Sequence, residues 1–374
     1  MSRATNAAPR APQTPPTAHT PHTPIARVIA LALALAAVVT VVVLAFAWPS
    51  VTAEPHDLPI AVVGSDQQVD AVADAIDEAQ PGAIALQRVD DRAAAVDAIE
   101  ERTAYGAIVL GEAPEVLTST ASSTVVAQLL NGIASTLEEQ VNAQVAAAAA
   151  AAGSPVAPPH VDVPVTDVVP LADTDPRGSG LTAAMFPLVM GGMIGGIAIS
   201  IAVIGALRRV AAVAVYAVAG GLVLAAVLGG WFGSLPGDYL LEASAIALAL
   251  AAIAAPITGF VALIGRAGIA VGPVVMMLFA NPISAAAMPK EFLPAPWGDV
   301  GQWFPPGAAA TLVRELSYFP QADTTFHWLV LAGWAIGGAL LSVLGHFRTA
   351  GGAEPDAVAA HEDDPVEERV PVPA

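Results

Sequence analysis

The sequence of 374 residues contains no cysteine, and only 13% of its residues are charged. The absence of cysteine excludes disulfides, thiolate nucleophiles, and zinc or iron–sulfur sites that depend on cysteine ligands. A soluble globular domain carries about 25% charged residues. Here whole stretches lack any charge while others are acidic, and this alternation is typical of membrane spans separated by water-exposed parts.

Positive charge is also scarce. The chain has 14 Lys and Arg residues, of which only Lys290 is a lysine, against 33 Asp and Glu, and its formal net charge is -19. Contacts to nucleic-acid phosphates need clusters of Lys and Arg. Nucleic acid is therefore not expected as a partner.

Several catalytic motifs are missing. The sequence has no G-x-x-x-x-G-K-[ST] loop, no G-x-S-x-G and no H-E-x-x-H, so it should neither hold ATP phosphates itself nor carry these hydrolytic sites. His56 and His160 are isolated, and the adjacent acids at 90–91 and 100–101 are interpreted as solvated charges. We therefore expect no enzyme activity, no catalytic residues, no cofactor and no metal site.

Long apolar segments are what the chain does have. A helix needs about 20 residues to cross a hydrocarbon core about 30 Å thick. Residues 25–48 are longer than a signal-peptide core and are interpreted as an uncleaved anchor. The sequence thus predicts a polytopic α-helical membrane protein with six transmembrane helices, five of them in a membrane domain at 181–348. These five are the runs Leu181–Leu207, Val210–Trp231, Ala243–Gly265, Ala267–Met288 and Phe326–Phe347.

Residues 49–152 have ordinary charge density. Strand-like apolar runs begin at Leu58, Ala83 and Tyr105 and alternate with helical spacing, which predicts an α/β domain with a small parallel sheet and right-handed crossovers. A long helix is expected at 123–152. Its apolar stripe either packs on the domain's own sheet or forms a dimer or partner surface. The stripe consists of Val125, Leu129, Ile133, Leu137, Val141 and Val145.

Three segments show no apolar period. Residues 1–24 are rich in Pro and Thr, and residues 349–374 are acidic, so both are expected to be disordered tails. Residues 153–180 are Pro-rich and acidic and are interpreted as a linker between the α/β domain and the membrane domain.

Basic residues set the orientation of the spans, because Lys and Arg near span ends concentrate in the cytoplasm. With six spans, all of these basic residues fall on one face and the acidic α/β domain falls on the other. We therefore predict a multi-pass protein of the cell (inner) membrane, with cytoplasmic N- and C-termini and an extracytoplasmic α/β domain between the first and second spans. The basic residues are Arg27, Arg208, Arg209, Arg266 and Arg348.

Glycine pairs one helical turn apart recur in the spans. Small residues at this spacing let helix backbones approach closely. They serve either packing within the bundle or formation of a homodimer, and the motif does not decide between them. The candidate packing pairs are Gly191 with Gly195, Gly192 with Gly196, Gly268 with Gly272, and Gly333 with Gly337.

Segment 281–319 is rich in proline and aromatic residues. Its prolines forbid one continuous helix, yet its Trp and Phe residues are too apolar for a free aqueous loop. We expect a re-entrant element that caps the outer end of the bundle, with Lys290, Glu291 and Arg314 in water or headgroups. It would gate substrate exit in a transporter, or merely seal the bundle. Candidate gate residues are Asn281, Pro282, Pro289, Trp297, Pro305, Pro306 and Arg314.

Two stretches carry a family resemblance. The first pairs LPIAVVGSD at 58–66 with YGAIVL at 105–110, and the second is the proline- and aromatic-rich segment 281–319. With the order of one span, an external domain and five more spans, the chain resembles the membrane subunits of ABC type-2 exporters and the related phage-infection-protein-like (YhgE/Pip) membrane proteins. It departs from them at Arg208-Arg209, where the exporters usually supply a helix that docks the ATPase.

The resemblance implies a permease subunit that moves a hydrophobic or amphipathic substrate outward and is powered by a separate P-loop ATPase. The alternative is a non-transporting envelope protein that presents its external domain to a partner or a phage. In either case the bilayer is the constant partner.

Overall fold

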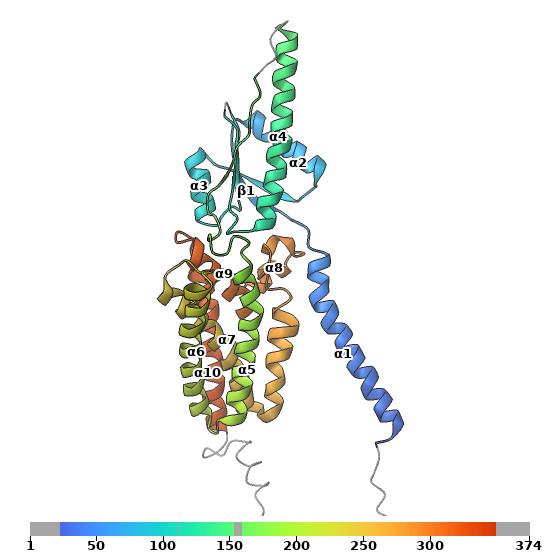
Figure 1. Ribbon diagram of the computed structural model, residues 1–374. Coiled ribbons are helices and arrows are strands. Elements are labelled where there is room, and N and C mark those ends of the chain that lie inside the picture. The colour runs from blue at the N-terminus through green and yellow to red at the C-terminus, as the bar shows by residue number, and fades with distance from the viewer. Residues whose placement is uncertain (1–22, 112, 153–158, 349–374) are drawn as a thin grey trace, which may run out of the picture. The chain divides into compact units, whose positions relative to one another are not determined.

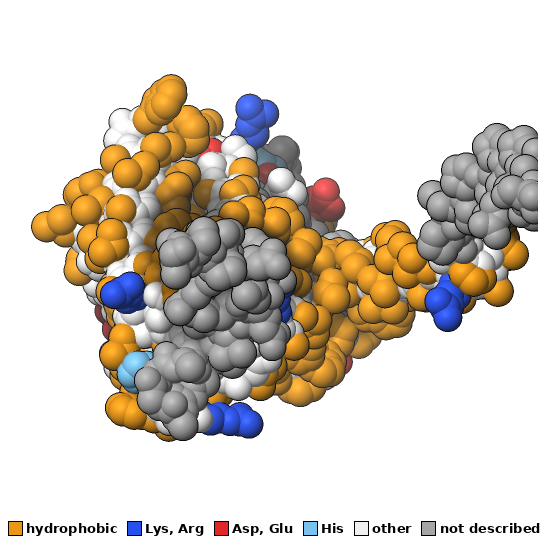
Figure 2. Space-filling view, turned by 90° about the horizontal axis from the view of Figure 1, so that it is seen from below, with side chains coloured by type: hydrophobic (Ala, Val, Ile, Leu, Met, Phe, Trp, Pro, Cys, Tyr) orange, Lys and Arg blue, Asp and Glu red, His pale blue; other side chains and the backbone are white. Residues whose placement is uncertain are grey.

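The structure is a computed structural model that describes residues 23–111, 113–152 and 159–348. The chain divides into two compact units, 1–44 and 45–374. Most of the expected N-terminal tail and all of the expected C-terminal tail lie outside the described residues. Five helices in the described part are long and apolar enough to cross a membrane, and hydrophobic side chains cover much of the surface seen in Figure 2. The chain is thus a polytopic helical membrane protein.

Helix α1 (Ile25–Val51) covers the first expected span and continues past Trp48. It contains no glycine, and its proline, Pro49, lies in the last turn. Apolar residues surround the helix on all sides, as in segments surrounded by lipid.

A mixed five-stranded sheet organises the α/β domain. Its strands lie in the order β2-β1-β3-β4-β5, with β1 parallel to β2 and β3, β3 antiparallel to β4, and β4 parallel to β5. Strand β1 is apolar along its whole length because both of its faces are covered. The strands are β1 (Leu58–Val63), β2 (Ile84–Arg88), β3 (Ala107–Val109), β4 (Glu115–Thr118) and β5 (Val165–Asp167).

Helices cover both faces of this sheet. Helices α2 (Asp66–Ala79) and α4 (Thr124–Ala151) lie on one face, and α3 (Arg92–Glu100) lies on the other (Figure 1). Caps fix where two of them start, because the side chain of Asp91 accepts from Ala94 N and that of Ser123 accepts from Val126 N.

Two features of the domain differ from the sequence expectation. The sheet is not wholly parallel, because β3 and β4 are joined by a short connection that permits only an antiparallel pair. Residues 153–180 are not a free linker throughout, because they contain β5, which pairs with β4. Strand β5 has only three residues, with exposed or half-exposed side chains, and their alternation is too weak for a strand to be recognised from the sequence.

The helix bundle is built around one central helix. Helix α7 (Tyr239–Ile264) is buried over most of its length, and its many alanines let α5 (Ser179–Ala202), α6 (Ala206–Ala225) and α10 (Thr325–Arg348) approach closely. Helix α6 continues as a π-helical turn at Ala226–Trp231.

The segment expected to form the fifth span, Ala267–Met288, is not a long regular helix. A 3₁₀ helix at Gly265–Ala270 leads into a π-helix at Gly272–Ala280, which runs beside α5 toward α8 (Figure 1). Pro273 lacks the N–H that an α-helix needs, and Gly272 directly precedes it, so the regular hydrogen-bond ladder is interrupted here. Six spans were expected and the described residues contain five long apolar helices. The expected span without a long helix is this segment.

Segment 281–319 folds into short pieces. A turn after the π-helix is followed by a 3₁₀ turn at Lys290–Phe292, by α8 (Trp297–Gly301) and by α9 (Pro305–Tyr318). Pro305 and Pro306 occupy the first positions of α9, where a missing N–H does no harm.

Candidate functional site: a polar cavity between the α/β domain and segment 281–319

Arg102 enters the site from the end of α3. It has a left-handed backbone (φ 60°), a conformation that usually belongs to glycine at the end of a helix. Its N–H and that of Thr103 bond back to carbonyls of α3. Holding a side chain in this conformation costs on the order of 1 kcal/mol, and its effect is to direct Arg102 away from α3 toward the helix bundle.

Glu315 is the centre of a buried ionic cluster. Its carboxylate, on α9, lies 3.6 Å from Arg102 Nη1 and 3.2 Å from His327 Nδ1 on the first turn of α10. The three side chains are only 8–12% exposed, and Arg102 also stacks over the ring of Phe319 at 5.2 Å. Charges this deeply buried persist only when they are paired.

A second polar contact links the α/β domain to segment 281–319. Tyr105 Oη donates to Glu291 Oε2 at 2.8 Å, and the backbone N–H of His56 donates to the Glu291 carbonyl. Burial first, and then the charge of Glu291, raise the pKa of Tyr105 well above its usual value. Next to Glu291, Phe292 packs into the apolar core of the α/β domain.

Arg314 is a half-buried cation on α9, and no acidic side chain in the described ranges pairs with it. Burial, and then the charge of Arg102, lower its pKa to about 10, so it stays charged at neutral pH. It donates to the Ala286 carbonyl at 3.2 Å, and within the described ranges no carboxylate lies within 4.0 Å of it. Arg314 thus lines a partly open cavity, and its expected place in water or headgroups stays a prediction.

These side chains surround a cavity of ≈ 480 Å³. Lys290 and Asp299 form an exposed pair at 2.7 Å among its lining residues. Gln302 donates to the Ser284 carbonyl and accepts from Thr311, which orders the wall formed by α8 and α9. The arrangement places two guanidinium groups, those of Arg102 and Arg314, beside a partly open polar space, and such groups can hold an anion.

The structure brings only part of the expected gate together. Pro289 and Arg314 line the cavity. Asn281 and Pro282 lie in the turn after the π-helix, Trp297 is half-exposed against Phe279, and Pro305 and Pro306 are buried at the start of α9. Sequence reasoning missed Arg102, Tyr105, Glu315 and His327, because they come from elements far apart in the chain. An arginine just past a helix end, where glycine is usual, was the available signal.

The glycine pairs divide into two groups. A Cβ on Gly191 would contact Tyr216, and on Gly192, Gly195, Gly196, Gly268 or Gly272 it would crowd a neighbouring segment at 3.0 Å or less, so these six pack within the bundle. At Gly333 and Gly337 it would meet nothing within 4 Å. Gly338, Gly259 and Gly345, which make the close contact between α7 and α10, were not recognised from the sequence.

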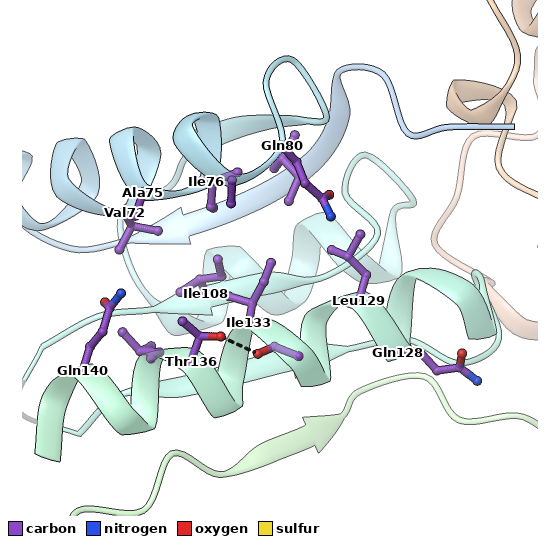
Figure 3. Close-up of a pocket in the computed structure, with 14 residues that line it drawn as sticks. Val72, Ala75, Ile76, Gln80, Ile108, Gln128, Leu129, Ile133, Thr136 and Gln140 are labelled. Atoms are coloured by element: carbon purple, nitrogen blue, oxygen red, sulfur yellow. Dashed lines mark hydrogen bonds between the residues drawn. The ribbon is translucent and has the colours of Figure 1, made fainter. Parts of the chain in front are cut away.

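A second hollow lies on the α/β domain. It is an apolar groove of ≈ 570 Å³ between α2 and α4, with Ile108 of β3 in its floor (Figure 3). Leu129, Ile133 and Leu137 of the expected stripe line it, whereas Val126, Leu130 and Ala134 pack on the sheet. Three of the six stripe residues thus line the groove, and two of these, Ile133 and Leu137, also pack against the domain's own core.

His160 is not isolated, contrary to the sequence interpretation. Its Nε2 lies 3.2 Å from Glu138 Oε1 and 3.5 Å from Asp162 Oδ1, and one atom of each residue could hold a metal ion. His160 and Asp162 are exposed, and exposed acidic groups are common without a metal. Glu138 also accepts from Val163 N, so the cluster fastens the chain leading to β5 onto α4.

Comparisons of this chain with protein-family models, with curated proteins and with solved structures found no match.

Proposed function

We propose that this chain is the membrane permease subunit of an ABC type-2-like exporter, which moves a hydrophobic or amphipathic substrate outward and is powered by a separate ATPase. The supporting observation is the ionic cluster at Glu315, which joins the α/β domain to α9 and α10. A passive cap over a bundle would be sealed at least as well by apolar side chains. A buried charged link is better suited to passing movement between a domain and a gate.

The proposal includes six crossings, with the π-helical segment 265–280 as the fifth. Helix α5 leaves the α/β domain at Ser179, so the ends of the helices that carry Arg208, Arg266 and Arg348 lie at the opposite end of the bundle. By the positive-inside rule that end is cytoplasmic. The α/β domain and segment 281–319 are then extracytoplasmic, and both termini lie inside.

The test is purification of the tagged full-length chain from its own host's membranes, in mild detergent and after cross-linking. A P-loop ATPase should co-purify in stoichiometric amount, and ATP hydrolysis should be absent once that protein is removed. Recovery of the chain without any P-loop ATPase would contradict the proposal. Hydrolysis by the chain alone would contradict it as well, since its sequence has no phosphate-binding loop.

The second candidate function is presentation of the α/β domain to an envelope partner or a phage. The observation that favours it is the apolar groove between α2 and α4, because exposed apolar surface of this kind is typical of interaction sites. Leu129→Glu would place a charge in the groove. It should abolish partner capture or phage adsorption if this function is correct, and should leave ATPase association unchanged if the permease function is correct.

A further inference from the structure

Four buried side-chain atoms at the polar cavity make no hydrogen bond. Three of them belong to the contacts of Glu315 with Arg102 and His327 described above, whose geometry does not satisfy them. Five such side-chain atoms occur in the described part of the chain, and the residues carrying four of them line this cavity. Buried polar atoms in folded proteins are nearly always satisfied by protein, water or a ligand. The four atoms are Arg102 Nη1, Ser122 Oγ, Glu315 Oε2 and His327 Nδ1.

The donors among these groups favour an anion. Arg102 and Arg314 are two guanidiniums beside one another, and Glu315 is the only carboxylate that pairs with either of them in the described ranges. Glu291 and Asp299 are engaged by Tyr105 and Lys290. A negatively charged oxygen ligand would supply the acceptor that the second guanidinium lacks.

The cavity adjoins an apolar groove. Trp303 and Phe326, which stack edge to face at 4.9 Å, line both the polar cavity and a groove of ≈ 630 Å³ along α10. The groove continues past Gly333 and Gly337, where no other atom would meet a side chain. It is lined almost entirely by apolar residues of α7 and α10, within the length of two helices that are long enough to span the bilayer.

We propose that the cavity and the groove together form one binding site for an anionic amphiphile, with its phosphate or carboxylate headgroup at Arg102 and Arg314 and its acyl chain along Gly333 and Gly337. This inference rests on the proposed function, of which it names the substrate class. Gly333 and Gly337 leave room for the acyl chain. Trp303 and Phe326 lie at the boundary between the headgroup and the acyl chain. A free phosphate would use the same guanidiniums without the groove.

The experiment titrates the purified full-length chain, in an uncharged detergent, with phosphatidic acid carrying brominated chains. Trp303 and Trp334 both line the groove, so a bound brominated chain should quench tryptophan fluorescence. Phosphatidylcholine with the same chains should quench at about tenfold higher concentration or more, because it lacks the net negative charge. Inorganic phosphate should compete only weakly, since it has no chain.

Matched variants separate the two halves of the site. Arg102→Gln should weaken phosphatidic acid binding about tenfold or more, through loss of a charge-assisted hydrogen bond, while Arg102→Lys should lose less. Gly333→Leu should weaken it similarly by filling the groove, and Gly230→Leu, at another position where a side chain would meet nothing, should have no effect.

Three results would overturn the proposal. They are equal quenching by phosphatidic acid and phosphatidylcholine, insensitivity to both Arg102→Gln and Gly333→Leu, and tight binding of inorganic phosphate that Gly333→Leu leaves unchanged. A change from dimer to monomer in Gly333→Leu, with no change in quenching, would mean that a second copy covers the groove and would also overturn it. None of these readouts involves an ATPase, so binding can fail or succeed independently of the permease proposal.

Discussion

Arg102 Nη1 lies 3.6 Å from Glu315 Oε1. This contact joins the end of α3, in the α/β domain, to α9, in segment 281–319. The other Glu315 oxygen faces His327 at the start of α10. One carboxylate therefore connects three segments that are far apart in the sequence. Its removal should affect all three, which leads to the first prediction.

Replacement of Glu315 by glutamine should lower the free energy of unfolding by about 3 kcal/mol, because it leaves the buried Arg102 guanidinium without a counter-charge. The control is Asp299→Asn, which breaks a pair whose side chains are 45% and 71% exposed and should cost less than about 1 kcal/mol. Denaturant unfolding in detergent measures both. Equal effects of the two substitutions would contradict a buried, coupled cluster.

The α/β domain should fold without the spans, and should be more stable when β5 is included. Fragment 54–169 contains all five strands, whereas fragment 54–152 lacks β5 and leaves β4 as an unpaired edge. We expect cooperative thermal unfolding of the longer fragment, at a higher midpoint than that of the shorter one. Identical midpoints, measured by circular dichroism, would mean that β5 does not contribute to the domain.

The longer fragment should lose stability in acid partly through Glu115. Hydrogen bonds from Arg92 and Thr166 hold the pKa of Glu115 below its usual value. A carboxylate with a lowered folded pKa adds stability that is present above its unfolded pKa of about 4.5 and is lost as the pH falls through the folded value. Glu115→Gln should therefore flatten the decline of stability below about pH 4.5, and an unchanged decline would show that the ion pair contributes nothing.

The α/β domain was largely predictable from the sequence, because its strands and helices have clear periods. Leu58–Val63 is an apolar run with the length of a strand, and the helix before Arg102 begins at a capping aspartate. The short strand β5 and the interrupted helix at 265–280 could not be recognised, since neither carries a regular period. Their conformations depend on neighbouring elements and on Pro273.

Only the part of the candidate site that lies in segment 281–319 was predictable from the sequence. The prolines and aromatic residues of this segment mark it as unusual, and two of its expected gate residues, Pro289 and Arg314, line the cavity. Arg102, Tyr105 and His327 belong to other elements, and no local pattern says that they face segment 281–319. Side chains assembled from separate elements become visible only once the chain is folded.

The expected orientation can be tested because the chain has no cysteine of its own. A cysteine introduced for labelling needs an exposed position in the α/β domain. Ser135 on α4 is exposed and suits this purpose, whereas Ser122 is only 4% exposed and would react poorly with any reagent. Ser135→Cys should react with a membrane-impermeant maleimide in intact cells, and Ala267→Cys, at the other end of the bundle, should react only after permeabilisation. The reverse pattern would place the α/β domain in the cytoplasm.

Gly333 and Gly338 of α10 should differ sharply in how well they tolerate a side chain. A Cβ on Gly338 would lie 2.3 Å from the backbone of Ala255, where α7 and α10 touch, whereas a Cβ on Gly333 would meet nothing within 4 Å. Gly338→Leu should therefore separate the two helices and lower the melting temperature in detergent by several degrees or prevent folding, at a cost of about 1–3 kcal/mol or more. Gly333→Leu should melt within about a degree of the unaltered chain, since a surface change far from packed groups alters stability by less than about 0.5 kcal/mol. If both substitutions were equally harmful, α10 would pack through both faces and the groove along Gly333 would already be filled; if both were harmless, the close contact between α7 and α10 would be absent.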